Sequence, residues 1–142
     1  MAANIALITG GASGMGLAVA QELSARGDRV LNILAINETA GLKLTQYLPR
    51  VVFHSANVTN YGELCDTFQK SFLGCDRLDF VFASTGVIER TYAPAPTELK
   101  GVVPTTWLAQ HYFCLSPHKG RDANVVTTAS CDGLYPSAYS PL

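Results

Sequence analysis

The stretch LITGGASGMGLAVAQEL, Leu7 to Leu23, places a glycine-rich turn between an apolar run and an amphipathic segment. Residues 5–9 are a candidate strand, and residues 14–26 are a candidate helix that Gly27 would end. Three glycines, at positions 10, 14 and 16, lie where backbone N–H groups and the positive end of a helix can face a pyrophosphate. A tight turn that needs glycine only for its backbone conformation is the competing interpretation.

Strand and helix patterns alternate along the rest of the chain. Asn37 is expected to cap a helix that reaches about residue 47, and Asn60, with Glu63, to open a helix that reaches about residue 73. Further strands are expected at residues 30–35, 51–54, 78–83 and 124–129, and a broken helical stretch at 98–115. This alternation predicts an α/β fold with a doubly wound parallel sheet of about five strands in the order 3-2-1-4-5.

Composition limits the classes of protein that fit. With 142 residues, 48% hydrophobic and 15% charged, the chain is expected to form a single globular domain over residues 1–142. Ten basic and eleven acidic residues without a basic run exclude nucleic acid as an expected partner. No apolar segment approaches the ~20 residues of a membrane span, so a cytoplasmic protein is expected. Metal or disulfide chemistry is not expected at the scattered cysteines Cys65, Cys75, Cys114 and Cys131.

The helical stretch at 98–115 contains an aromatic segment and a proline. Pro104 removes a backbone hydrogen bond, so the helix is expected to kink or to start afresh there. We place five side chains on one broad face that serves either core packing or a dimer interface: Trp107, Leu108, His111, Tyr112 and Leu115. Strand 124–129 is expected to be an open sheet edge, so we expect a homo-oligomer through residues 105–115 or 124–129.

The loop TGGASGMG, Thr9 to Gly16, resembles the TGxxxGxG loop of the short-chain dehydrogenase/reductase family. The similarity continues through ANVTN at 56–60, LDFVFASTG at 78–86, LKGV at 99–102 and NVVTTASCDG at 124–133. It covers essentially the whole chain but only the first part of a family member, and it implies a Rossmann-like fold that is incomplete relative to the family. The resemblance assigns cofactor binding to Gly10, Ala12, Ser13, Gly14, Met15, Gly16, Asn57, Val58, Ala83 and Gly86.

Several positions depart from the family pattern. Ala35 stands where NAD-dependent members carry an acid for the ribose, and no Arg or Lys of an NADP-type site replaces it. Asn57 replaces the Asp that contacts adenine, and the NNAG motif reads Ala83, Ser84, Thr85, Gly86. NAD or NADP is therefore expected to bind weakly or not at all, because a charged hydrogen bond contributes ~1.5–3 kcal/mol.

The resemblance also assigns the catalytic positions. Ser130 matches the family Ser, which holds the substrate oxygen, whereas Glu98 stands at the place of the Asn that supports a proton-relaying water. By the spacing from Ser130, the YxxxK motif would begin directly after Leu142, so the expected form is truncated before that motif. Tyr139 is a neighbouring phenol without a Lys beside it, and a phenol of pKa ~10 is a poor acid or base near neutral pH.

Three functions remain open from the sequence. The leading hypothesis is an enzyme repurposed for non-redox chemistry on a small molecule, such as isomerisation, dehydration or cyclisation, with Ser130, Glu98 and Tyr139 as its catalytic candidates. An alternative is an NAD(P)-dependent short-chain oxidoreductase in truncated form, and another is a non-catalytic binding module. Ordinary dehydrogenase activity is not expected from this chain alone.

Overall fold

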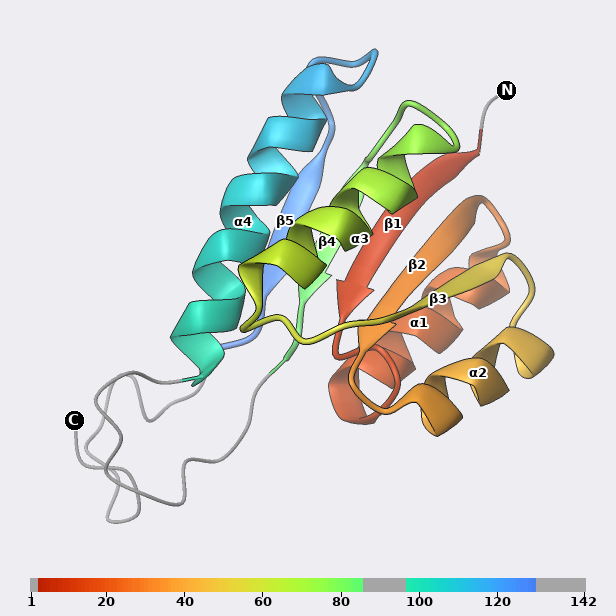
Figure 1. Ribbon diagram of the computed structural model, residues 1–142. Coiled ribbons are helices and arrows are strands. Elements are labelled where there is room, and N and C mark those ends of the chain that lie inside the picture. Colours follow the sequence, from red (N-terminus) through yellow and green to blue (C-terminus); the bar gives the residue numbers. More distant parts are fainter. Residues whose placement is uncertain (1–2, 86–96, 130–142) are drawn as a thin grey trace.

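One parallel sheet organises the residues that the computed structural model describes, which are 3–85 and 97–129 (Figure 1). Its strands stand in the order β3-β2-β1-β4-β5, as the alternation predicted. Every neighbouring pair is parallel, so the carboxyl ends of the strands share one edge of the sheet. The strands are β1 (Asn4–Thr9), β2 (Arg29–Ala35), β3 (Val51–Ser55), β4 (Phe80–Ala83) and β5 (Asn124–Thr127).

Helices cover both faces of the sheet. The helices are α1 (Gly14–Arg26), α2 (Glu38–Tyr47), α3 (Tyr61–Leu73) and α4 (Thr97–Leu115). In Figure 1, α3 and α4 lie in front of the sheet, and α1 and α2 lie behind it. Each face of the sheet has its own hydrophobic core, and alternate residues of β1 belong to the two cores. Ile5 and Leu7 share one core with Phe68 of α3, whereas Ala6 and Ile8 share the other with Leu23 of α1. Successive side chains of a strand point to opposite faces of the sheet, and both faces of β1 are covered by helices, so all of these residues are buried.

Both predicted asparagine caps are confirmed. The Asn37 side chain accepts a hydrogen bond from the Ala40 N–H at 3.0 Å, and the Asn60 side chain accepts from the Gly62 N–H at 3.1 Å. Glu63 departs from a simple capping box, because its carboxylate accepts from the Asn57 N–H at 2.7 Å and from the Asn60 side-chain amide at 2.7 Å. Glu63 thus holds the loop between β3 and α3 against the start of the helix.

A fresh start at Pro104, one of the two expected outcomes, is wrong, because one helix, α4, spans Thr97 to Leu115; the other outcome, a kink, stays a prediction. A proline inside a helix costs about 3 kcal/mol through a lost hydrogen bond and a clash with the preceding turn. Burial of Ala109 and Phe113 against the sheet and α3 offsets this cost. Threonine hydroxyls also bond within this part of the helix, as in the 2.6 Å bond from Thr105 Oγ1 to the Gly101 carbonyl.

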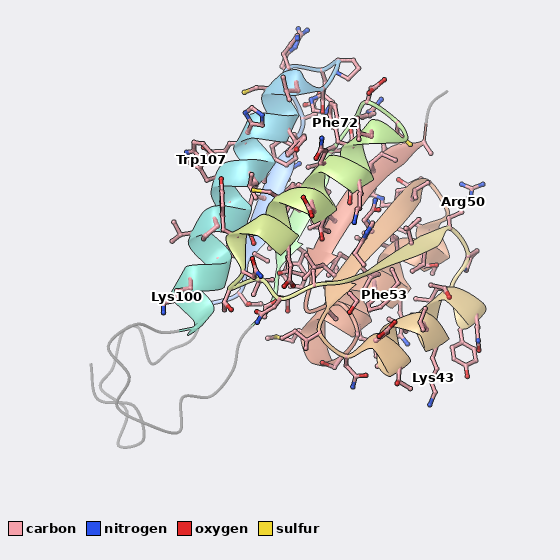
Figure 2. All side chains as sticks on the ribbon, in the orientation of Figure 1. Lys43, Arg50, Phe53, Phe72, Lys100 and Trp107 are labelled. Carbon is pink, nitrogen blue, oxygen red and sulfur yellow. The ribbon has the colours of Figure 1, made fainter. Side chains whose placement is uncertain are left out.

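The broad face predicted for α4 is divided between the core and solvent. Leu108 is buried in the core, and Tyr112 stacks on Phe68 with ring centroids 5.7 Å apart. Trp107, by contrast, is 63% exposed and projects from α4 on the side away from α3 (Figure 2). Leu115 is 51% exposed. The five positions fall within an arc of about 140° around the helix axis, and only the margin of that arc with Leu108 and Tyr112 faces the core, so the other margin is left in solvent.

β4 and β5 are shorter than expected, and loops replace their ends. Leu78 precedes β4, and its N–H donates to the Ser116 hydroxyl at 2.9 Å instead of to a neighbouring strand.

Within the described ranges, no helix is long and apolar enough to cross a membrane. The cysteines of this part are free thiols, with Cys65 half-buried and Cys75 and Cys114 exposed, while Cys131 lies outside the described residues.

Candidate functional site

The glycine loop connects β1 to α1 at the carboxyl edge of the sheet. Gly10 and Gly14 have φ values of 68° and 52°, in the left-handed region that favours glycine. Gly16 packs so closely on Gly10 that an added Cβ would lie 2.8 Å from the Gly10 carbonyl carbon and 3.0 Å from the Gly11 Cα. The glycines are therefore required both by backbone conformation and by close approach of the loop to the helix.

The amino terminus of α1 is open to a ligand. Ser13 is the N-cap residue, but its side chain makes no capping hydrogen bond. Its carbonyl accepts from the Leu17 N–H at 3.1 Å, and within the described part of the chain the N–H groups of Gly14, Met15 and Gly16 have no hydrogen-bond acceptor. Ser13, Gly14 and Met15 are exposed, whereas Ala12 and Gly16 are buried. Free amides at a helix start can bind an anion such as a diphosphate.

β4 borders the glycine loop. Ala83 pairs with Thr9 and is buried, and the next residue, Ser84, donates its N–H to the Thr9 hydroxyl at 3.2 Å. Thr85 follows and touches Gly10, because a Cβ on Gly10 would lie 3.1 Å from Thr85 Oγ1. Thr85 was not predicted as a site residue, although it belongs to the segment that replaces the family's NNAG motif and follows a central strand.

The end of β2 carries no charged side chain. Ala35 is buried, and its carbonyl accepts from the Ala56 N–H at 3.2 Å. Ile36 is exposed, and the Asn37 side chain is engaged in capping α2. The family's ribose-binding acid thus has no substitute among these three residues, while the loop beside them fits a diphosphate.

Asn57 and Val58 lie in the turn after β3. The Asn57 side-chain oxygen accepts from both the N–H and the hydroxyl of Thr59, at 3.0 and 2.8 Å. This orientation leaves the Asn57 amide NH2 as the group that a ligand can meet. Val58 is buried and limits the approach of α4, because a Cβ on Gly101 would lie 2.7 Å from Val58 Cγ2. The need for glycine at 101 was not recognised from the sequence.

Of the three proposed catalytic residues, only Glu98 belongs to a described element of the structure. Glu98 belongs to the first turn of α4. Ser130 and Tyr139 lie outside the described residues, and so does Gly86 of the cofactor set. β5 ends at Thr127, and Thr128 donates its N–H to the Ala83 carbonyl at 3.2 Å. The roles of Ser130, Glu98 and Tyr139 remain predictions.

Two histidines have structural partners. His54 lies 2.9 Å from the side-chain oxygen of buried Asn32 on the neighbouring strand, and burial lowers the pKa of His54. His118 lies 2.9 Å from the Leu78 carbonyl, and its Nδ1 accepts from the Gly120 N–H at 3.0 Å. Among the described residues no group of three or more His, Cys, Asp or Glu side chains could hold a metal ion.

Comparison with known proteins identifies relatives that match at least 90% of this chain. Residues 4–142 match the family model described as short chain dehydrogenase. The short-chain dehydrogenase/reductase prx7 of Penicillium rubens is 48% identical, over 90% of this chain and 53% of that protein. The NADP-dependent dehydrogenase clz5 of Cochliobolus lunatus is 36% identical, over 96% of this chain and 51% of that protein. The mouse (Mus musculus) 15-hydroxyprostaglandin dehydrogenase (NAD+) is 30% identical, over 97% of this chain and 54% of that protein.

Solved structures share the fold. A short-chain type dehydrogenase/reductase from Mycobacterium marinum matches with a TM-score of 0.81 at 18% identity, over 95% of this chain and 59% of that chain. The chain therefore spans about half the length of the relatives that it matches. The glycine loop, the strand order and the family match lead to one assignment: the chain belongs to the short-chain dehydrogenase/reductase family.

Proposed function

We propose that this chain is the dinucleotide-binding part of an NAD(P)-dependent oxidoreductase that acts on a small alcohol or carbonyl compound. The observation that carries the proposal is the glycine loop, in which Gly10 and Gly14 adopt left-handed conformations and Gly16 leaves no room for a Cβ. Relatives with dehydrogenase names, one NADP-dependent and one with NAD+ in its name, favour redox chemistry over the non-redox hypothesis.

The glycine loop offers more hydrogen bonds to the diphosphate than Ala35 and Asn57 offer to the adenosine portion of the dinucleotide. The free N–H groups of Gly14, Met15 and Gly16 would hold the diphosphate. A bound nicotinamide supplies or accepts the hydride, and this chain binds and orients it. We expect a weaker hold on the adenosine portion, because Ala35 offers no carboxylate and the Asn57 oxygen is already used by Thr59.

Ala35 and Asn57 also favour a second candidate, the non-redox enzyme acting on a small molecule. An enzyme of that kind has no need to discriminate the ribose or the base of a nicotinamide dinucleotide. The two candidates differ in one measurable property, which is affinity of the folded chain for NADH or NADPH.

The test is a calorimetric titration of the whole chain with NADH and NADPH, together with two alanine variants. Gly16→Ala places a Cβ against the Gly10 backbone and is expected to abolish binding. Gly74→Ala is the matched control, because its Cβ would meet nothing within 4 Å and its φ is −80°. Absence of binding by the unaltered chain contradicts the proposal, and equal binding by Gly16→Ala excludes the loop as the site.

A charge variant separates binding from folding. Ser13→Asp puts a carboxylate at the exposed N-cap of α1, where it can accept from backbone N–H groups and interact favourably with the helix dipole. The thermal midpoint of the free chain is expected to be unchanged or higher, whereas dinucleotide affinity falls because the carboxylate repels the diphosphate. Retained affinity would place the diphosphate elsewhere.

A further inference from the structure

Thr85 has an unusual hydroxyl for its position. Thr85 Oγ1 is a buried side-chain oxygen that makes no hydrogen bond with any described part of the chain. A buried hydroxyl without a partner destabilises a folded protein, whereas an apolar group of the same shape does not. The hydroxyl therefore needs a partner that the described residues do not provide.

The hydroxyl lies beside the glycine loop. The Ser84 N–H lies 3.2 Å from the hydroxyl and 3.3 Å from the carbonyl oxygen of Thr9, which fixes the end of β4 against the end of β1. The next residues, Thr85 and Gly10, then face one another across the carboxyl edge of the sheet. A Cβ on Gly10 would lie 3.1 Å from Thr85 Oγ1 and 3.2 Å from Thr85 Cα. The absence of a side chain at Gly10 leaves the hydroxyl next to the loop backbone.

We infer that Thr85 Oγ1 donates a hydrogen bond to an oxygen of the bound dinucleotide, and that Thr85 is thus a binding residue of this site. The inference rests on the function proposed above. Both the diphosphate and the adjoining ribose offer acceptor oxygens, and a hydroxyl donor suits either. Binding of the dinucleotide would then satisfy a group that the free protein leaves unpaired.

If Thr85 has this role, removal of its hydroxyl should lower the affinity for the dinucleotide without lowering the stability of the ligand-free chain. Thr85→Val keeps the shape and removes the hydroxyl, so the free chain is expected to be at least as stable toward urea as the unaltered chain. The same variant is expected to bind NADH and NADPH about 2- to 12-fold more weakly, the equivalent of one hydrogen bond of roughly 0.5–1.5 kcal/mol. Thr85→Ser keeps the donor and is expected to retain the affinity.

Thr67→Val is the matched control, because Thr67 is also buried but its hydroxyl donates to the Glu63 carbonyl at 2.9 Å, away from the loop. It is expected to leave dinucleotide affinity unchanged. Titration with ADP, which lacks the nicotinamide ribose, narrows the acceptor: a loss with both ligands indicates the diphosphate or the adenosine ribose, and a loss with NADH alone indicates the nicotinamide ribose.

Two results would overturn the role of Thr85 while leaving the proposed function intact. One is NADH affinity of Thr85→Val equal to that of the unaltered chain. The other is a loss of stability in the ligand-free Thr85→Val protein, which would show that the hydroxyl already has a partner. If the unaltered chain binds neither dinucleotide, both the role and the proposed function are rejected.

Discussion

Ser116→Ala is expected to destabilise the fold by removing one hydrogen-bond acceptor from the core. Ser116 is fully buried directly after α4, and its hydroxyl accepts from the Leu78 N–H at 2.9 Å and donates to the Tyr112 carbonyl at 2.8 Å. Alanine leaves the Leu78 N–H without this acceptor, which costs about 1–3 kcal/mol. The substitution thus weakens the connection between the end of α4 and the start of β4.

Ser71→Ala provides a control that removes the same atoms. Ser71 is also buried, but its hydroxyl donates to the Thr67 carbonyl at 2.8 Å within α3 and accepts from no backbone N–H among the described residues. That carbonyl lies inside a helix and has a backbone partner, and alanine is the better helix former. We therefore expect a change within about 0.5 kcal/mol.

Thermal unfolding followed by far-ultraviolet circular dichroism measures both variants. For a domain of this size, each 1 kcal/mol lowers the thermal midpoint by roughly 2–4 °C. Ser116→Ala should therefore unfold several degrees below Ser71→Ala. Equal losses in the two variants would refute the reasoning that an unpaired N–H, rather than the missing hydroxyl itself, determines the cost.

Ala35→Asp should raise the affinity for NADH relative to NADPH, because a carboxylate accepts from ribose hydroxyls and repels a 2′-phosphate; an unchanged ratio in paired titrations contradicts this. Burial, and secondarily the charge of Lys70, lower the pKa of His54. Below about pH 6.5 the unfolded chain takes up a proton that the folded chain resists, so the free energy of unfolding decreases as the pH is lowered. His54→Gln should flatten that slope in urea unfolding, and an unaltered slope would exclude His54 as its source. Self-association through the outer side of α4 predicts that Trp107→Glu lowers the sedimentation coefficient while Leu42→Glu, also exposed, does not; sedimentation of the unaltered chain as a monomer contradicts it.

Local signals in the sequence determined most of the elements of this fold. The strand and helix around the glycine loop, and the helices that begin after Asn37 and Asn60, lie where the sequence predicted them. Each signal acts within about four residues, through a glycine φ preference or a side chain that accepts a backbone N–H. The alternation of strands and helices, with the family resemblance, was enough to predict the sheet order.

Tertiary packing decided what these local signals could not. Continuity of α4 through Pro104 depends on buried contacts of that helix, and the exposure of Trp107 depends on which side of α4 meets the sheet. The contact of Gly101 with Val58, and that of Thr85 with Gly10, join residues more than forty positions apart. A sequence pattern records which residues favour a conformation, whereas these contacts exist only once the strands have assembled in their order. The loop that can bind a diphosphate was thus determined by the sequence itself, and the hydroxyl beside it was placed there by the assembled sheet.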